Sequence, residues 1–399
     1  MKKVYLFHKG IQHADQTCFA LQESNQLHRF VTSRFFIKNK YPYKILNLFP
    51  DKSYIKKRLF TRYNKNLNVK NIKLFGLFSW INLILNFFSL GKSFNKYEYE
   101  YFSKRVIKDI EKDIKNIDII WGFNNYSYDV FKKFKKTKVI KVLDLTIAFI
   151  LDAEKRFSKK NDIYQLSKVE RDKQILEVKL ADRIVVGSKF TQQSLINYKI
   201  PSSKIKIIPY GFDETLFKKE YLKKRILKKN QTLKILFVGT INKRKGADHL
   251  INAIKKFNKS KVKLLMIGEN QLDININELP NNIEIKPFMQ KKEFLKYFYK
   301  SHLFCFPTLF EGGTITVFEA VGAGLAILTT KESTHKITNF GNIKLKSGSE
   351  KSIVSAIKKI LNKPSKIEEM SLKSIKLYDE YKWSNYRKKV SNFINEIKT

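Results

Sequence analysis

Strand-like and helix-like segments alternate along this chain, and the alternation restarts after an interruption near the middle. A short apolar run at 4–7 is followed by a helical pattern, and the same order recurs further along. Such alternation is typical of a parallel sheet that helices cover on both faces. Strands are expected at 4–7, 117–123, 137–145, 181–188 and 204–211 in the first half, and at 233–240, 262–268, 282–288, 302–308 and 326–330 in the second.

The interruption is a charged segment at 218–230, KKEYLKKRILKKN, which shows no core pattern. Segments of this composition commonly separate domains. The sequence therefore predicts an α/β protein with two Rossmann-like domains, the first over 1–217 and the second over 218–383. Ligands of doubly wound sheets bind at the carboxyl ends of the strands, so we expect a binding cleft between the domains. One long charged helix is expected over about 153–180.

The net charge of +43 arises from 79 Lys and Arg residues against 36 Asp and Glu. Most of the basic residues are lysines scattered over the whole chain, which a genome-wide composition bias explains as well as a function does. Nucleic-acid readers rely on arginine for bidentate contacts, and no zinc, homeodomain or RRM pattern occurs. Nucleic acid is therefore not an expected partner, whereas an acidic substrate or an anionic membrane surface is.

The two cysteines, Cys18 and Cys305, show no metal-binding spacing, so neither a zinc site nor a disulfide framework is expected. Such cysteine usage is typical of a reducing cytoplasm. The apolar run at 4–7 is too short for a signal peptide and is better interpreted as a buried strand. These features favour a cytoplasmic protein.

The segment 306–328, FPTLFEGGTITVFEAVGAGLAIL, places two glutamates on either side of a glycine turn. A strand is expected to end before Glu311, and a helix to begin near Thr314. Free backbone N–H groups at a helix start bind anions, and glycines let a phosphate approach them closely. Glu311 and Glu319 would then face one ligand. The alternative is a helix N-terminal charge followed by a solvated glutamate in mid-helix.

The segment 235–253 contains a buried strand that ends at Gly239, a polar loop and a helix. Arg244 and Lys245 lie in the loop, directly before Gly246. A fixed cation beside a helix N-terminus suits a diphosphate. A solvated loop is the alternative in so lysine-rich a chain, and the scarcity of arginine favours the diphosphate.

With their surroundings, these segments resemble glycosyltransferase family four, a family of retaining enzymes with the GT-B fold. FVGTINKRKGADHLINA resembles its donor element, and EGGTITVFEA followed by GAGLAIL resembles its Glu-x7-Glu element. ADRIVVGSKFTQQSL and KIKIIPYGFDETLF resemble the stretch that ends the first domain, and Trp383 stands where the last helix begins. The resemblance implies a central cleft and a C-terminal helix, 384–399, that crosses back to the first domain.

The resemblance also implies a reaction, the retaining transfer of a hexose-type sugar in cell-envelope polysaccharide synthesis. The donor would be a nucleotide-diphosphate sugar, and the acceptor a glycan or a lipid-linked glycan. Lys245, with Arg244 beside it, would pair with the diphosphate, and Glu311 would contact the transferred sugar. Glu319 would contact the ribose. Further donor contacts are expected at Gly239, Gly312, Gly313 and Thr314.

The sequence departs from the family pattern in the first domain and near Gly239. The turn after the first strand holds only Gly10, and His13 is expected to replace an amide donor there, unless it is a loop or helix-cap residue. Leu143–Asp144 stands where many members have a His-Asp pair, which leaves the acceptor-side catalytic residue unassigned. Thr240 stands where arginine is common. No Asp-x-Asp occurs, which favours an enzyme that needs neither a metal nor a cofactor.

A protein that binds a nucleotide sugar without transferring it is the alternative function. The missing His-Asp pair at Leu143–Asp144 motivates this alternative. The presence of Glu311, Lys245 and Glu319 favours the enzyme.

An apolar stretch at 74–90 is interrupted by polar residues and is slightly short for a membrane-spanning helix. It is interpreted as a buried helix or as a segment that docks on a membrane. Lysine clusters flank it at Lys56, Lys57 and 132–136, and apolar insertion with attraction to anionic lipid is how peripheral proteins are anchored. The docking interpretation predicts a peripheral protein on the inner face of the membrane.

Overall fold

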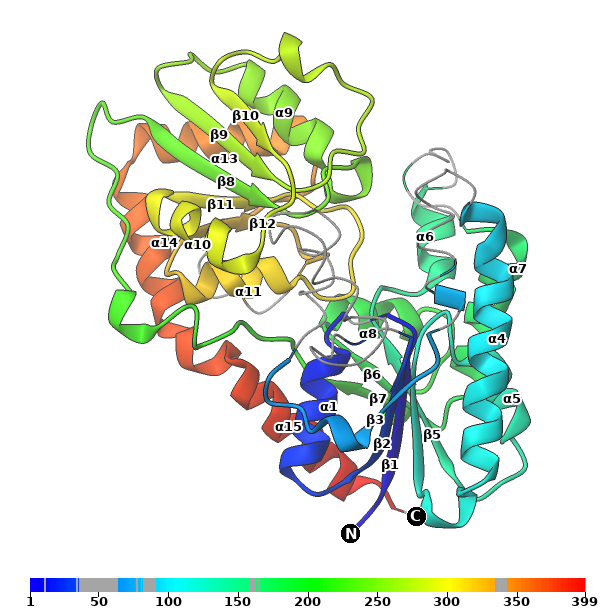
Figure 1. The fold of residues 1–399 in the computed structure, drawn as a ribbon. Helices are drawn as coiled ribbons and strands as arrows, with labels where there is room; N and C mark the ends of the chain where they lie inside the picture. The colour runs from blue at the N-terminus through cyan, green and yellow to red at the C-terminus, as the bar shows by residue number, and fades with distance from the viewer. Residues whose placement is uncertain are drawn as a thin grey trace, which may run out of the picture.

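The computed structural model describes residues 1–10, 12–33, 35, 64–76, 78, 79, 81, 91–157, 163, 166–333, 337 and 343–398. The described residues form two parallel β-sheets, one in each half of the chain, with helices around both (Figure 1). The predicted α/β fold with two Rossmann-like domains is confirmed.

The first sheet is ordered β3-β2-β1-β4-β5-β6-β7, and every neighbouring pair is parallel. The chain builds outward from β1 to β3 and then returns to place β4 on the other side of β1. A crevice opens at the carboxyl ends of the strands where the order reverses in this way. The strands are β1 (Val4–His8), β2 (Leu27–Thr32), β3 (Ile72–Leu74), β4 (Ile119–Phe123), β5 (Ile140–Leu145), β6 (Arg183–Val186) and β7 (Ile205–Ile207).

The second sheet repeats this arrangement in the order β10-β9-β8-β11-β12-β13. Its reversal point lies between β8 and β11, which pair in parallel. All four residues of β11 are buried, as expected for a strand that helices cover on both faces. The strands are β8 (Leu233–Val238), β9 (Val262–Ile267), β10 (Ile283–Lys286), β11 (Leu303–Phe306), β12 (Ala326–Thr329) and β13 (Ile343–Lys344).

The single long helix expected over about 153–180 is wrong, because α6 (Ile150–Phe157) ends well before α7 (Lys168–Leu180) begins. A capping box starts α7, in which Ser167 and Glu170 satisfy each other's backbone N–H groups. The other helices are α1 (Ala14–Glu23), α4 (Gly91–Glu111), α5 (Tyr128–Lys133), α8 (Lys189–Ile196), α9 (Ala247–Lys255), α10 (Lys291–Lys300), α11 (Ile315–Gly322), α13 (Glu350–Asn362), α14 (Ser365–Lys376) and α15 (Trp383–Glu396).

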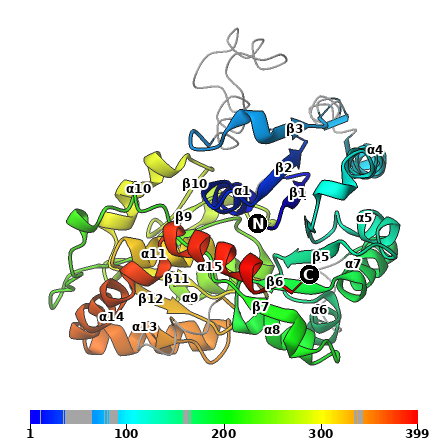
Figure 2. The same ribbon diagram turned by 90° about the horizontal axis from the view of Figure 1, so that it is seen from below.

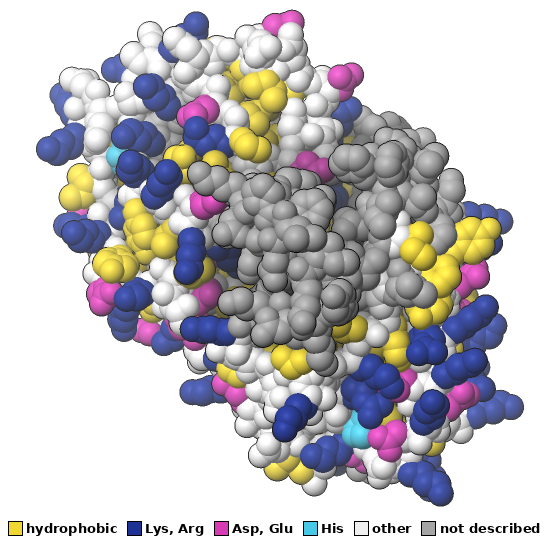
Figure 3. Space-filling model, in the orientation of Figure 1, with side chains coloured by type: hydrophobic (Ala, Val, Ile, Leu, Met, Phe, Trp, Pro, Cys, Tyr) yellow, Lys and Arg dark blue, Asp and Glu magenta, His cyan; other side chains and the backbone are white. Residues whose placement is uncertain are grey.

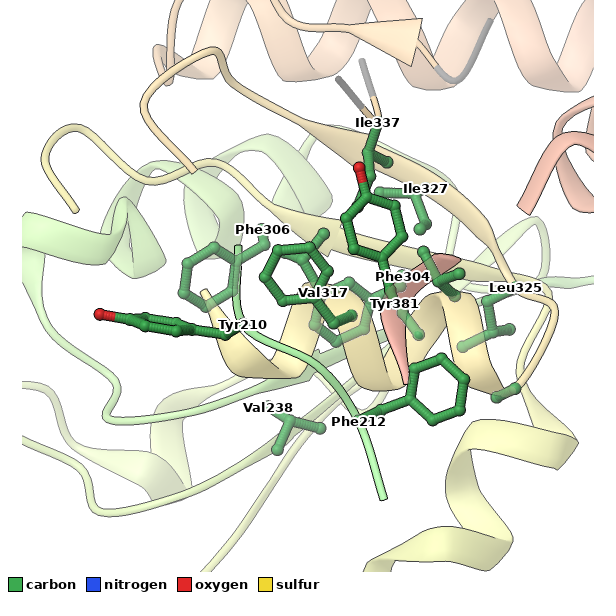
Figure 4. Packing of buried hydrophobic residues seen from close by; sticks show 14 of the residues in the cluster. Tyr210, Phe212, Val238, Phe304, Phe306, Val317, Leu325, Ile327, Ile337 and Tyr381 are labelled. Atoms are coloured by element: carbon green, nitrogen blue, oxygen red, sulfur yellow. The ribbon is translucent and has the colours of Figure 1, made fainter. Parts of the chain in front are cut away.

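Two backbone segments cross between the domains side by side. The amide of Phe212 donates to the Tyr381 carbonyl at 2.9 Å, and the amide of Trp383 donates to the Phe212 carbonyl at 3.0 Å. Beyond this crossing, α15 packs against α1 of the first domain, as Figures 1 and 2 show. Figure 4 shows Phe212 and Tyr381 packed beside α11, and both belong to an apolar cluster that includes residues of both domains. The residue limits of the two domains stay a prediction.

Most of the apolar stretch at 74–90 lies outside the described residues, as do Lys56 and Lys57. Of its described residues, Phe75 is buried, whereas Ile81 is 37% exposed. No helix within the described part of the chain is long and apolar enough to cross a membrane. On the face shown in Figure 3, Lys and Arg side chains are spread over both domains.

A buried glutamate on α7 holds the start of α5. The carboxylate of Glu177 accepts hydrogen bonds from the backbone N–H groups of Asn125 at 2.8 Å, Ser127 at 2.7 Å and Tyr128 at 3.1 Å. Burial raises the pKa of Glu177 from 4.5 to about 7, although the three hydrogen bonds oppose this shift. Folding therefore favours the protonated form of this carboxyl group.

Glu177→Gln should flatten the pH dependence of stability between pH 4.5 and about 7. In this window the folded protein holds a proton on Glu177 that the unfolded chain has lost, so the stability falls as the pH rises. The amide side chain of the variant cannot ionise, which removes this contribution. Urea unfolding of both proteins at several pH values measures the effect, and parallel stability curves would contradict the raised pKa.

Candidate active site

The loops that follow β8 and β11 start side by side at the reversal point of the second sheet. The β11–α11 loop also touches the first domain. The amide of Ala148 donates to the Glu311 carbonyl at 3.2 Å, and the Thr191 hydroxyl donates to the Gly312 carbonyl at 2.8 Å. These bonds bring the predicted donor residues against the carboxyl end of the first sheet.

Lys245 directs its ammonium group toward Gly239 at the end of β8. A Cβ on residue 239 would lie 3.0 Å from the Lys245 Nζ, and the φ of 143° at this position also favours glycine. Burial lowers the pKa of Lys245, and Glu311 opposes that effect. Among the described residues, no carboxylate forms an ion pair with Lys245, because Glu311 pairs with Arg244. Within the described part of the chain, Lys245 is therefore a partly buried cation without a counter-ion, which suits an anionic ligand.

Arg244 is held by the β11–α11 loop. Its guanidinium forms an ion pair with the Glu311 carboxylate at 2.9 Å and donates to the Phe310 carbonyl at 2.6 Å. The backbone contributes as well, because the Leu309 amide donates to the Arg244 carbonyl at 2.9 Å. In this structure, Arg244 therefore orients Glu311. Its contact with a diphosphate stays a prediction.

Gly312 and Gly313 make room for the first domain. A Cβ on Gly312 would overlap the Thr146 carbonyl oxygen, and a Cβ on Gly313 would lie 2.9 Å from a ring carbon of Tyr210. Thr314 follows as the N-cap residue of α11, but its hydroxyl does not cap the helix and is buried without a partner. The sequence predicted glycines here for the approach of a phosphate, and the structure shows a second reason, the close packing of the two domains.

Glu319 lies on α11 and is 1% exposed, so the alternative of a solvated mid-helix glutamate is wrong. The Lys291 ammonium at the start of α10 forms an ion pair with the Glu319 Oε1 at 2.7 Å. Glu311 and Glu319 thus each have a basic partner of their own in this structure. Their contacts with sugar and ribose stay predictions.

His13 and Asp144 form a buried pair in the first domain. The His13 Nε2 lies 3.0 Å from the Asp144 Oδ2, and the two side chains are 2% and 0% exposed. The His13 ring packs on Tyr210, with ring centroids 4.2 Å apart. The other Asp144 oxygen and the Tyr210 hydroxyl are buried and have no hydrogen-bond partner among the described residues, and Figure 4 shows that hydroxyl pointing away from the apolar cluster. Buried polar atoms of this kind can bind a polar ligand.

The sequence did not predict the partners of two candidate site residues, His13 and Glu319. His13 precedes α1 and Asp144 lies on β5, so their pairing depends on the strand order, in which β4 lies between β1 and β5. In the sequence, only Asp144 pointed to such a partner, because it stands without the histidine of the expected His-Asp pair. Lys291 did not stand out, because it is one lysine among many.

Part of this chain matches a protein family model, and two known proteins are similar in sequence. A family model described as "Glycosyl transferases group 1" matches residues 218–376. A Klebsiella pneumoniae protein, described as an uncharacterized 41.2 kDa protein in the cps region, is 28% identical over 49% of this chain. An uncharacterized glycosyltransferase of Methanocaldococcus jannaschii is 26% identical over 38% of the chain. These alignments span only 52% and 40% of the two relatives.

Solved structures match over nearly the whole chain. Anabaena HepE in complex with UDP-glucose is 11% identical with a TM-score of 0.65, and the match covers 100% of both chains. Sucrose-phosphate synthase from Thermosynechococcus elongatus is 12% identical with a TM-score of 0.67, over 99% of both chains. At such identities the likeness concerns the fold, which is the predicted GT-B fold. Within this fold, residues 218–376 are the part that matches the group 1 family model.

His13→Ala should destabilise the protein by about 3–5 kcal/mol, because it leaves the buried Asp144 carboxylate without its partner. The double variant His13→Ala/Asp144→Ala should lose less than the sum of the two single variants, since removing both groups leaves no buried charge. Urea unfolding of the four proteins measures this coupling. Additive losses would contradict a His13–Asp144 interaction.

Proposed function

We propose that this chain is a retaining glycosyltransferase of family four, which transfers a hexose-type sugar from a nucleotide-diphosphate donor to a glycan or lipid-linked acceptor. The observation that carries the proposal is Lys245, a partly buried cation without a carboxylate partner among the described residues, beside the glycine that ends β8. The group 1 domain around it supports a sugar-transferring role. The cps-region description of the Klebsiella relative supports a role in envelope polysaccharide synthesis.

The chemistry requires stabilisation of a departing diphosphate. The bond between the anomeric carbon and the diphosphate oxygen breaks, and the acceptor oxygen bonds to that carbon from the same face. The departing phosphate takes the acceptor proton, so positioning and charge stabilisation are the main tasks of the protein. Lys245 and the N-terminal amides of α11 would stabilise the phosphate charge without a metal or a cofactor.

The remaining residues orient the two substrates. Arg244 would hold the Glu311 carboxylate toward the transferred sugar, as their 2.9 Å ion pair suggests. Glu319 would accept hydrogen bonds from the ribose. The unpartnered oxygen of Asp144 and the Tyr210 hydroxyl supply polar groups in the first domain, where the acceptor would bind. His13 would then orient Asp144, in place of the donor contact first expected of it.

Lys245→Ala should lower transfer strongly, since a charge-assisted contact to a developing phosphate charge is worth about 2–4 kcal/mol in the transition state. Arg244→Ala should cost less, because Arg244 acts through Glu311. Turnover of a panel of nucleotide sugars measures both effects, and Lys243→Ala is the matched control, an exposed lysine of the same loop. Normal turnover in both variants and in the double variant would refute the phosphate assignment.

The first domain is also proposed to dock on anionic membranes at the cytoplasmic side, where lipid-linked acceptors would be reached. The 74–90 stretch would supply the apolar contact, and its described residue Ile81 is 37% exposed. The large positive charge would supply the electrostatic contact, at about 1 kcal/mol per lysine near the surface.

Flotation with vesicles tests this docking. The protein should bind anionic vesicles at low salt, and high salt should weaken the binding without abolishing it, because only the electrostatic part is screened. Neutral vesicles are the control and should bind less. Absence of binding to either vesicle at low salt would refute membrane docking and favour a soluble acceptor.

A further inference from the structure

The carboxylate of Glu319 is placed where an isolated charge is unfavourable. The neighbouring α11 residues Val317, Phe318, Ala320 and Val321 are all 0% exposed, and Glu319 itself is 1% exposed. An ionised carboxylate in apolar surroundings requires a partner, or it takes up a proton.

Lys291 is the one basic side chain paired with Glu319 in the described part of the chain, with its Nζ 2.7 Å from the Oε1. Desolvation opposes the charge on Lys291, but the carboxylates of Glu319, Asp213 and Asp15 together outweigh it and raise the pKa of the ammonium group. Lys291 therefore remains charged opposite Glu319. Asp15 belongs to α1 of the first domain, so acidic groups of both domains raise the pKa of Lys291.

The position of Lys291 is unfavourable for its own helix. It is the first residue of α10, where the helix dipole disfavours a positive charge. Glu293 provides the favourable acidic charge in this turn and completes the capping box with Gln290. The lysine thus contributes nothing favourable to the start of α10, and its described ion pair is with α11.

We propose that Lys291 is a positioning residue that holds the buried Glu319 carboxylate in place for the ribose hydroxyls of the donor nucleotide. The inference rests on the proposed function, because it assumes that Glu319 contacts the ribose. Lys291 acts through Glu319 and not on the diphosphate, which is assigned to Lys245. Loss of Lys291 therefore weakens the recognition of a nucleoside and spares the recognition of a diphosphate.

Calorimetric binding of UDP, GDP, ADP and pyrophosphate tests this difference. Lys291→Gln should raise the dissociation constant of the preferred nucleoside diphosphate about tenfold, which corresponds to about 1.4 kcal/mol, and leave pyrophosphate binding unchanged. Lys291→Arg should restore nucleotide binding, because it keeps the charge. Lys292→Gln is the matched control, since Lys292 is the next exposed lysine of the same helix. A general folding defect would lower pyrophosphate binding as well and would overturn the assignment.

Two further variants separate this inference from the function on which it rests. Glu319→Gln should weaken nucleotide binding, and Lys291→Gln should add no further loss in its presence. If Glu319→Gln weakens binding and Lys291→Gln does not, the inference on Lys291 is wrong and the ribose contact stands. If Glu319→Gln binds every nucleotide normally, the ribose contact fails, and the inference falls with it.

Discussion

The packing of the Gly312 backbone against the first domain determines where the charged groups of the cleft lie. The Gly312 carbonyl accepts the Thr191 hydroxyl, and its Cα leaves no space for a side chain next to the Thr146 carbonyl. The same turn holds Glu311 next to Arg244 and begins the helix that carries Glu319. If the distance between the two domains changed, Glu311 and Glu319 would therefore move together relative to the first domain.

Within the described residues, three pairs of ionisable side chains lie in this region. Arg244 pairs with Glu311, Lys291 with Glu319, and His13 contacts Asp144. Buried pairs contribute little net stability, because desolvation offsets their attraction. Such pairs orient side chains well, however, since each partner loses its alternative positions. Among the described residues, Lys245 forms no ion pair with a carboxylate, and in the proposed function its ammonium group would bind the diphosphate.

The parts of this structure that follow from local pattern were predictable, and the parts that follow from topology were not. The strand expected over 302–308 corresponds to β11. It was predictable because a short continuous apolar run is typical of a strand that is buried on both faces. The predicted helix over about 153–180 failed, because charged residues carry no signal for a break inside a helical pattern. His13 and Asp144 lie 131 residues apart, and only the strand order brings them together. The same holds for Lys291 and Glu319, which reside on separate helices.

The net charge of +43 attracts anions from a distance, whereas the charge of Lys245 acts on a ligand in contact with it. Exposed lysines spread over both domains attract any anion, and salt screens this attraction beyond about 10 Å at 0.1 M. A partly buried ammonium group in contact with its ligand is screened much less, because neither water nor counter-ions enter between the two charges. Salt should therefore slow the encounter with an anionic donor while leaving the bound complex largely intact. In the proposed function, the surface lysines would therefore affect how fast a donor arrives, and Lys245 would affect whether it stays bound and reacts.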